Sequence, residues 1–137
     1  MAIQPLSQWT VPGDRMYDQR HQWYLIDGSQ VTMGITDYTQ DTAGDILYVS
    51  LPAAGTEIKA GQPIGSIESG KWVGQIYAPF DGVVVSVNAR VEEAPPLLNQ
   101  SPYDQGWMVQ IQPNQQEDLN RLITSEAYQA LLIAGGQ

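Results

Sequence analysis

Between two short predicted strands the chain reads Glu68-Ser69-Gly70-Lys71-Trp72-Val73-Gly74. Residues 63–68 before this stretch and 74–79 after it are predicted as strands, because turn residues separate them from their neighbours. Lys71 is therefore expected at the tip of a β-hairpin, where side chains leave the sheet. A covalent carrier needs such a position, since its amine must be reachable and the finished arm must swing. A solubilising lysine at a hairpin tip fits the local sequence equally well.

The glycines beside this lysine have expected roles in the backbone. Gly70 is expected to permit the tight bend, and Gly74 to let the second strand begin. Lys59, the only other lysine of the chain, lies just before a glycine turn and is interpreted as a solvated surface charge.

The rest of the chain is punctuated by turns in the same way. Further short strands are predicted at 22–26, 30–35, 46–51, 57–59, 83–87 and 108–111. A short helix is expected to begin at Thr36 or Asp37 and to end at Gly44 in the left-handed conformation. Strands this short and evenly spaced predict a mainly β fold, a small sandwich or flattened barrel.

The chain length suits one domain with one modest core. We predict a single domain over residues 1–137, with an irregular segment over 1–20, a loop over 92–107 and a helical segment over 114–133. Asn114 and Glu117 have the spacing of a capping box, and Ser125 is expected to cap a second helical turn. The apolar side chains of this helical segment are interpreted as covering the core.

Composition excludes several classes of partner. Fifteen acidic residues against six basic ones give a net charge of −9, which repels nucleic acid and anionic membranes. The chain has no cysteine, so any thiol chemistry must come from an attached cofactor. No apolar run is long enough to span a membrane, and the first residues do not resemble a signal peptide. A cytoplasmic protein is expected.

An enzyme is the first rival interpretation. His21 is the only histidine, and it has no recognisable nucleophile motif around it. The acidic pairs Glu92-Glu93 and Glu117-Asp118 fall in loop and helix-start contexts, where carboxylates are usually solvated. Neither metal-ligand spacing nor a phosphate loop is present in the sequence.

The chain resembles the glycine cleavage system H protein family of lipoyl carriers from His21 onward. The lipoylation segment of the family is matched by Glu68-Ser69-Gly70-Lys71 and by Ile76-Tyr77-Ala78-Pro79. Further matches, in chain order, are His21-Gln22-Trp23, Met33-Gly34-Ile35-Thr36, Gln40, Gly44-Asp45, Leu51-Pro52, Gly55, Leu98-Asn99, Ser101-Pro102-Tyr103, Gly106-Trp107 and 127–132.

This resemblance implies a lipoyl-domain-like barrel-sandwich hybrid with a short N-terminal helix and C-terminal helices. It implies that Lys71 holds lipoate covalently as N6-lipoyl-lysine, with Glu68, Ser69, Gly70 and Trp72 as neighbours in the attachment motif. Biotinyl domains share the fold but flank their lysine with methionines, which favours lipoate here. Such a carrier has no catalytic activity of its own and is modified by a lipoate ligase or lipoyl-assembly enzymes.

The chain also departs from the family pattern. Gly70 replaces the usual valine before the lysine, the bulky Trp72-Val73 follows it, and Gln22 replaces the usual glutamate. Trp72 is expected to pack on the apolar arm, to fix a docking surface, or simply to cover the hairpin.

Three functions remain open at this point. Gly70-Lys71-Trp72 is more similar to the H-like lipoate-binding proteins of heterodisulfide-reductase-like sulfur oxidation, and we favour a carrier of sulfur-bound intermediates to that complex. The alternative is glycine cleavage, in which an aminomethyl group passes between the decarboxylase, the aminomethyltransferase and dihydrolipoyl dehydrogenase. A second alternative is an unmodified interaction module of the same fold.

Overall fold

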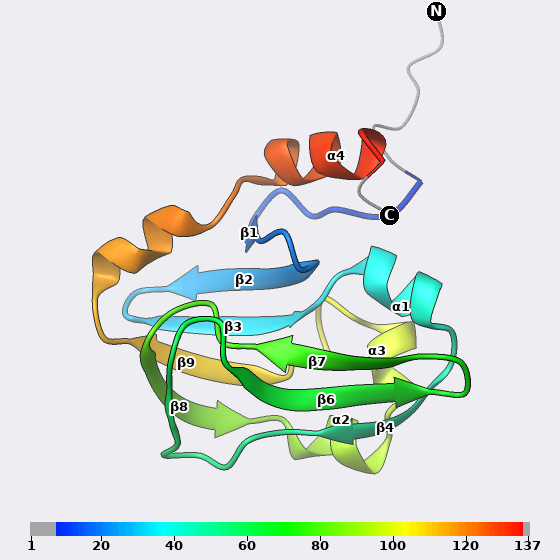
Figure 1. Ribbon diagram of the computed structural model, residues 1–137, viewed down its shortest axis with the longest axis horizontal. Helices are drawn as coiled ribbons and strands as arrows, with labels where there is room; N and C mark the ends of the chain where they lie inside the picture. The colour runs from blue at the N-terminus through cyan, green and yellow to red at the C-terminus, as the bar shows by residue number, and fades with distance from the viewer. Residues whose placement is uncertain (1–7, 136–137) are drawn as a thin grey trace, which may run out of the picture.

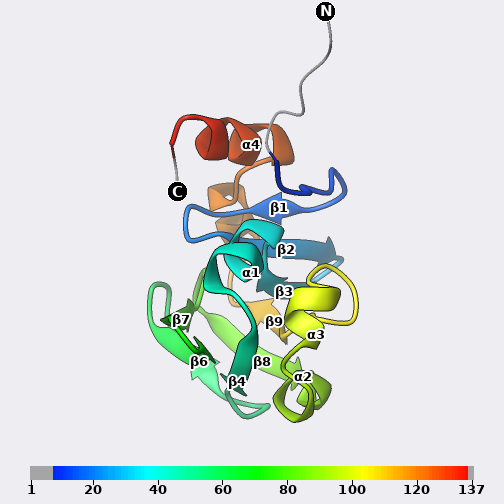
Figure 2. The same ribbon diagram turned by 90° about the vertical axis from the view of Figure 1, so that its right-hand side faces the viewer.

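Two antiparallel sheets face each other in the computed structural model, which describes residues 8–135 (Figures 1 and 2). The larger sheet has the strand order β1-β2-β3-β9-β8-β5, and the smaller one has the order β4-β6-β7. The strands are β1 (Met16–Tyr17), β2 (Gln22–Asp27), β3 (Gln30–Ile35), β4 (Ile46–Ser50), β5 (Glu57–Ile58), β6 (Pro63–Ser69), β7 (Val73–Tyr77), β8 (Gly82–Val87) and β9 (Val109–Pro113). The predicted mainly β sandwich or flattened barrel is confirmed.

Within residues 8–135, five helical segments connect or cover the sheets. They are α1 (Asp37–Ala43), α2 (Ala89–Glu93), α3 (Leu97–Gln100), the 3-10 helix η1 (Gln116–Arg121) and α4 (Ser125–Ile133). None of the helices in the described part of the chain is long and apolar enough to span a membrane.

Local turn chemistry explains several of these elements. Gly28 has a φ of 61° between β2 and β3, which suits the predicted hairpin turn. Gly44 ends α1 with a φ of 80° and a ψ of −164°. This combination is almost restricted to glycine, but it is not the left-handed helical conformation that we predicted. Thr36 occupies the N-cap position of α1 without a capping side-chain hydrogen bond.

Other sequence predictions were wrong in detail. The segment 1–20 was predicted irregular, yet Met16–Tyr17 pairs with β2, while residues 1–7 of that prediction lie outside the described part of the chain. The loop predicted over 92–107 contains α3 and the end of α2. The capping box at Asn114 is not formed, because the first helical turn of the tail is the 3-10 helix η1. Thr124, rather than Ser125, caps α4 by accepting a hydrogen bond from the Ala127 amide at 3.1 Å.

Two apolar clusters in the described part of the chain stabilise the fold. The larger lies between the sheets, where Ile67 and Ile76 of the small sheet pack with Met33 and Ile111 of the large one. The second, which we call the aromatic cluster, consists of Tyr17, Trp23, Tyr38, Tyr128 and Leu132. It joins β1, β2 and α1 to α4, which runs above β1 and β2 in Figure 1.

Candidate functional site

Lys71 lies in the loop that joins β6 and β7, at the right-hand side of Figure 1. Glu68 and Val73 form the last cross-strand pair, and the Ser69 amide donates to the Trp72 carbonyl at 2.8 Å. The buried Ser69 hydroxyl accepts a hydrogen bond from the Lys71 amide at 3.3 Å. These bonds close a two-residue loop with Lys71 at its tip, so the predicted hairpin is confirmed.

The Lys71 side chain is exposed and rests against the end of α1. A β-carbon built on Gly44 would lie 3.1 Å from Lys71 Cε and 3.8 Å from Nζ. Within residues 8–135, no carboxylate forms an ion pair with this amine. An open cavity of about 390 Å³, lined by Ala43, Gly44, Asp45, Leu47, Gly70 and Lys71, adjoins it. An amine that is exposed and unpaired in this way fits a covalently attached acyl group.

The two glycines of the motif do not act as predicted. Gly70 does not have a positive φ, and a β-carbon there would meet nothing within 4 Å. The bend therefore does not require glycine at position 70. A β-carbon on Gly74 would lie only 2.1 Å from the Trp72 ring, so Gly74 makes room for this indole. The ring covers the start of β7, as expected of a cover for the hairpin.

Asn99 is a positioning residue whose role was not predicted from the sequence. Its Oδ1 accepts from the Ile46 amide at 2.9 Å, and its Nδ2 donates to the Gly44 carbonyl at 2.9 Å and to Gln40 Oε1 at 3.1 Å. One side chain therefore fixes the end of α1 and the start of β4, against which Lys71 lies. No local sequence signal predicts this, because its partners are 53 to 59 residues away.

A cleft of about 250 Å³ begins beside Trp72 and reaches Gln75, Gln22 and Arg20. None of its ten lining residues is acidic. Gln22 is buried, and its amide nitrogen donates to the Tyr24 hydroxyl at 2.6 Å and to the Tyr77 carbonyl at 3.0 Å. An ionised glutamate at position 22 would have no proton to donate in either bond, so the amide suits this environment.

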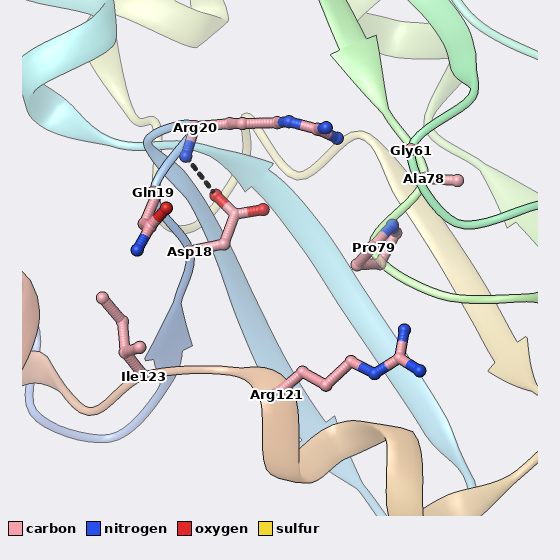
Figure 3. A pocket seen from close by; sticks show the side chains of 8 residues that line it. All are labelled: Asp18, Gln19, Arg20, Gly61, Ala78, Pro79, Arg121 and Ile123. Carbon is pink, nitrogen blue, oxygen red and sulfur yellow. Dashed lines mark hydrogen bonds between the residues drawn. The ribbon is translucent and has the colours of Figure 1, made fainter.

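A separate cavity of about 440 Å³ is lined by Asp18, Arg20, Pro79 and Arg121, among others (Figure 3). The Asp18 carboxylate accepts from the Tyr24 hydroxyl at 2.6 Å and from the Arg20 amide at 3.0 Å. Burial raises the pKa of Asp18, although these hydrogen bonds act in the opposite direction. None of the hairpin-loop residues lines this cavity, so it is not part of the candidate site.

Three of the residues considered for an enzyme, His21, Glu92 and Asp118, are engaged in structural contacts. His21 Nδ1 lies 2.7 Å from the Tyr128 hydroxyl, and its ring stacks on Tyr38. Glu92 accepts from the Leu51 amide at 3.0 Å, and Asp118 lies 3.7 Å from Arg121. Across residues 8–135, no cluster of three or more potential ligands could hold a metal ion.

Comparison with known proteins agrees with this geometry. The family model described as "Glycine cleavage H-protein" matches residues 15–134. The chain belongs to the glycine cleavage H-protein family. It is 42% identical over 124 residues to the glycine cleavage system H protein of Geobacillus kaustophilus, which covers 90% of this chain and 98% of that relative. Identity to the H protein of Thermus thermophilus is 43% over 122 residues, covering 89% and 95%.

A crystal structure of the glycine cleavage system H protein from Mycobacterium marinum has the same fold. It superposes with a TM-score of 0.78 at 34% identity, covering 86% of this chain and 95% of that one. Proteins of the glycine cleavage H-protein family carry a covalently attached lipoyl-lysine and have no catalytic activity of their own. The family prediction is confirmed, whereas these relatives do not support our preference for sulfur oxidation.

Proposed function

We propose that this chain carries an aminomethyl group in glycine cleavage, on a lipoyl group attached to Lys71. The exposed amine at the β6–β7 tip, in a member of the glycine cleavage H-protein family, is the observation that supports it. The partners are then a lipoate ligase or lipoyl-assembly enzymes, followed by the decarboxylase, the aminomethyltransferase and dihydrolipoyl dehydrogenase. A cytoplasmic location, as expected from the sequence, is part of this proposal.

Attachment needs a neutral Lys71 amine and an activated lipoyl carboxyl group. Nζ forms an amide bond with the acyl carbon, the activating group leaves with the bonding electrons, and Nζ loses a proton. A lipoyl group held in this way supplies a disulfide and dithiol pair that exchanges by thiolate attack. Ser69 holds the loop that presents the amine, and Asn99 fixes the helix end on which the side chain rests. Tethering raises the concentration of the carried group near each docked enzyme.

Mass spectrometry of protein purified from its own cells tests the attachment. The intact chain is expected to gain the mass of one lipoyl group, and peptide mapping is expected to locate it on Lys71 rather than Lys59. Protein that stays unmodified while the pathway is active would favour the unmodified interaction module instead.

The cleft beside Trp72 favours sulfur oxidation as a second candidate function. A primary amine is cationic at neutral pH, yet this cleft has no acidic lining residue and is lined by Arg20. A neutral or anionic sulfur-bound group suits such a lining better than a cationic amine does. The heterodisulfide-reductase-like complex would then be the partner.

Turnover with purified partner enzymes separates the two functions. Efficient aminomethyl transfer with glycine decarboxylase and the aminomethyltransferase would support glycine cleavage and contradict sulfur oxidation. Failure of that assay, combined with reaction of the lipoylated protein at the heterodisulfide-reductase-like complex, would reverse the assignment.

A further inference from the structure

The outer face of the small sheet carries a row of exposed side chains beside Lys71. Tyr48 pairs with Glu68, and Glu68 pairs with Val73, so the three side chains lie in line on one face. Tyr48 is 66% exposed and Val73 is 65% exposed, and Glu68 between them is exposed as well. The row ends two residues from Lys71.

A β-bulge adds a further apolar side chain to this row. The register of β4 against β6 shifts between Ile46 and Tyr48, which leaves Leu47 as an extra residue. In a regular strand Leu47 and Tyr48 would point to opposite faces. Here both are exposed, Leu47 to 51%, while Ile46 is buried. Leu47 also lines the cavity next to Lys71, so the bulge turns apolar surface toward the attachment site.

The other exposed apolar side chains are dispersed. Among residues 8–135, seven large apolar side chains are exposed, and four of them belong to the hairpin or to β4 beside it. Ile26, Val85 and Ile133 lie on β2, β8 and α4, one on each element. Single exposed apolar residues are ordinary, whereas a group of them marks an interaction surface.

We propose that Leu47, Tyr48, Glu68 and Val73 form the docking surface for the ligase that acylates Lys71; this rests on the proposed attachment at Lys71. The ligase has to reach the unmodified Lys71 amine before a lipoyl group is attached, so it must contact the hairpin itself. Enzymes that use the finished arm can react with it at a distance from the hairpin. The ligase is therefore the partner for which contact with this row is unavoidable.

The charge of the row specifies the chemistry of the partner surface. Glu68 lies between two apolar side chains, and Asp45 is exposed beside Leu47. A carboxylate covered by a partner must meet a cation or lose its hydration without compensation. The complementary surface is an apolar depression with an arginine or lysine opposite Glu68.

Lipoylation rates of surface variants test the proposal. The double variant Tyr48→Ser/Val73→Ser is incubated with a purified bacterial lipoate–protein ligase, lipoate and ATP, and the mass gain is followed. We expect kcat/KM for acylation to fall at least tenfold, mainly through KM. The matched control Ile26→Ser/Ile133→Ser removes two exposed apolar side chains elsewhere and should stay within twofold of wild type. Glu68→Gln should weaken the salt dependence of KM.

Several results would contradict the docking proposal. Acylation of the double variant at the wild-type rate would overturn the proposal, and so would normal acylation combined with slower turnover by downstream enzymes. If the double variant fails to fold, hydrogen exchange on Lys71→Arg with added ligase replaces it, and unchanged exchange at residues 46–48 and 73 would overturn the proposal. A wild-type chain that gains no lipoyl group at Lys71 would contradict the proposed function first, and the docking proposal with it.

Discussion

The region around the β6–β7 hairpin exposes its polar and aromatic side chains, whereas the aromatic cluster buries them. In the aromatic cluster, Trp23 is 1% exposed and donates to the Pro102 carbonyl at 2.9 Å. The buried Tyr128 hydroxyl lies 2.7 Å from His21 Nδ1 and 2.8 Å from Thr36 Oγ1. At the hairpin Lys71 is exposed, and Tyr48 on the neighbouring strand β4 is two-thirds exposed. Substitutions at the exposed site should therefore cost little free energy of unfolding, whereas substitutions in the aromatic cluster should cost much.

Replacing Lys71 should give the largest functional effect with almost no structural one. Lys71→Arg is expected to abolish lipoylation completely, because the guanidinium is not acylated, and to leave the melting temperature near that of wild type. Intact mass and thermal unfolding measure the two quantities. Lys59→Arg is the matched control and should be lipoylated normally. A large drop in melting temperature for Lys71→Arg would contradict the contrast between the two regions.

A pair of tryptophan variants should give the largest effect on stability. Trp23→Ala removes a buried ring that lies against Gly34, and it is expected to lower the free energy of unfolding by about 3–5 kcal/mol. Trp72→Ala removes a ring that is 38% exposed and should cost about 1 kcal/mol or less. Urea titrations compare the variants. Equal losses would mean that the hairpin is as tightly packed as the aromatic cluster.

Removing one hydroxyl should reveal the same contrast on a smaller scale. Tyr128→Phe removes the hydroxyl that lies within hydrogen-bond distance of both His21 and Thr36, at an expected cost of about 1–3 kcal/mol. Tyr48→Phe changes an exposed ring and should alter the free energy of unfolding by less than about 0.5 kcal/mol. Denaturant unfolding checks both, and a neutral Tyr128→Phe would count against the buried network.

Asp18 should make a small contribution to the pH dependence of the free energy of unfolding. Burial raises the pKa of Asp18 in the folded state, so the folded chain binds this proton more tightly than the unfolded chain. The corresponding stability is fully present below the unfolded pKa of about 3.9 and is lost as pH rises through the folded pKa. The slope of this contribution stays below about 1.4 kcal/mol per pH unit.

Denaturant unfolding at several pH values isolates this contribution. It should be missing in Asp18→Asn and retained in Asp45→Asn, because Asp45 is exposed. If wild type and Asp18→Asn show the same dependence on pH, the burial of Asp18 does not determine its titration.

Much of the hairpin could be predicted from sequence because its causes are local. Turn residues on either side of two short segments placed Lys71 between strands, and the structure agrees. The role of Gly70 was misjudged, since a glycine in a turn does not show by itself whether its φ is positive. The bulge at Leu47 depends on how β4 pairs with β6, and a single strand sequence does not contain that register.

The aromatic cluster was harder to foresee because its contacts join distant parts of the chain. Tyr17 pairs with Ile123 in an isolated bridge, and His21 meets Tyr128. Tail residues were correctly interpreted as covering the core, for Tyr128 and Leu132 are buried in the cluster. Nothing in the first twenty residues indicates that strand β1 would lie next to this tail.

The Asn99 side chain, which joins the end of α1 to the start of β4, makes the site sensitive to hydrolysis of its amide. Asparagine is thermolabile, and hydrolysis of its amide would leave a carboxylate at this position. That carboxylate would still accept from the Ile46 amide but would have no hydrogen to donate to the Gly44 carbonyl. It would also place negative charge at the carbonyl end of α1. The loss of the hydrogen bond to Gly44 would loosen the surface on which Lys71 rests.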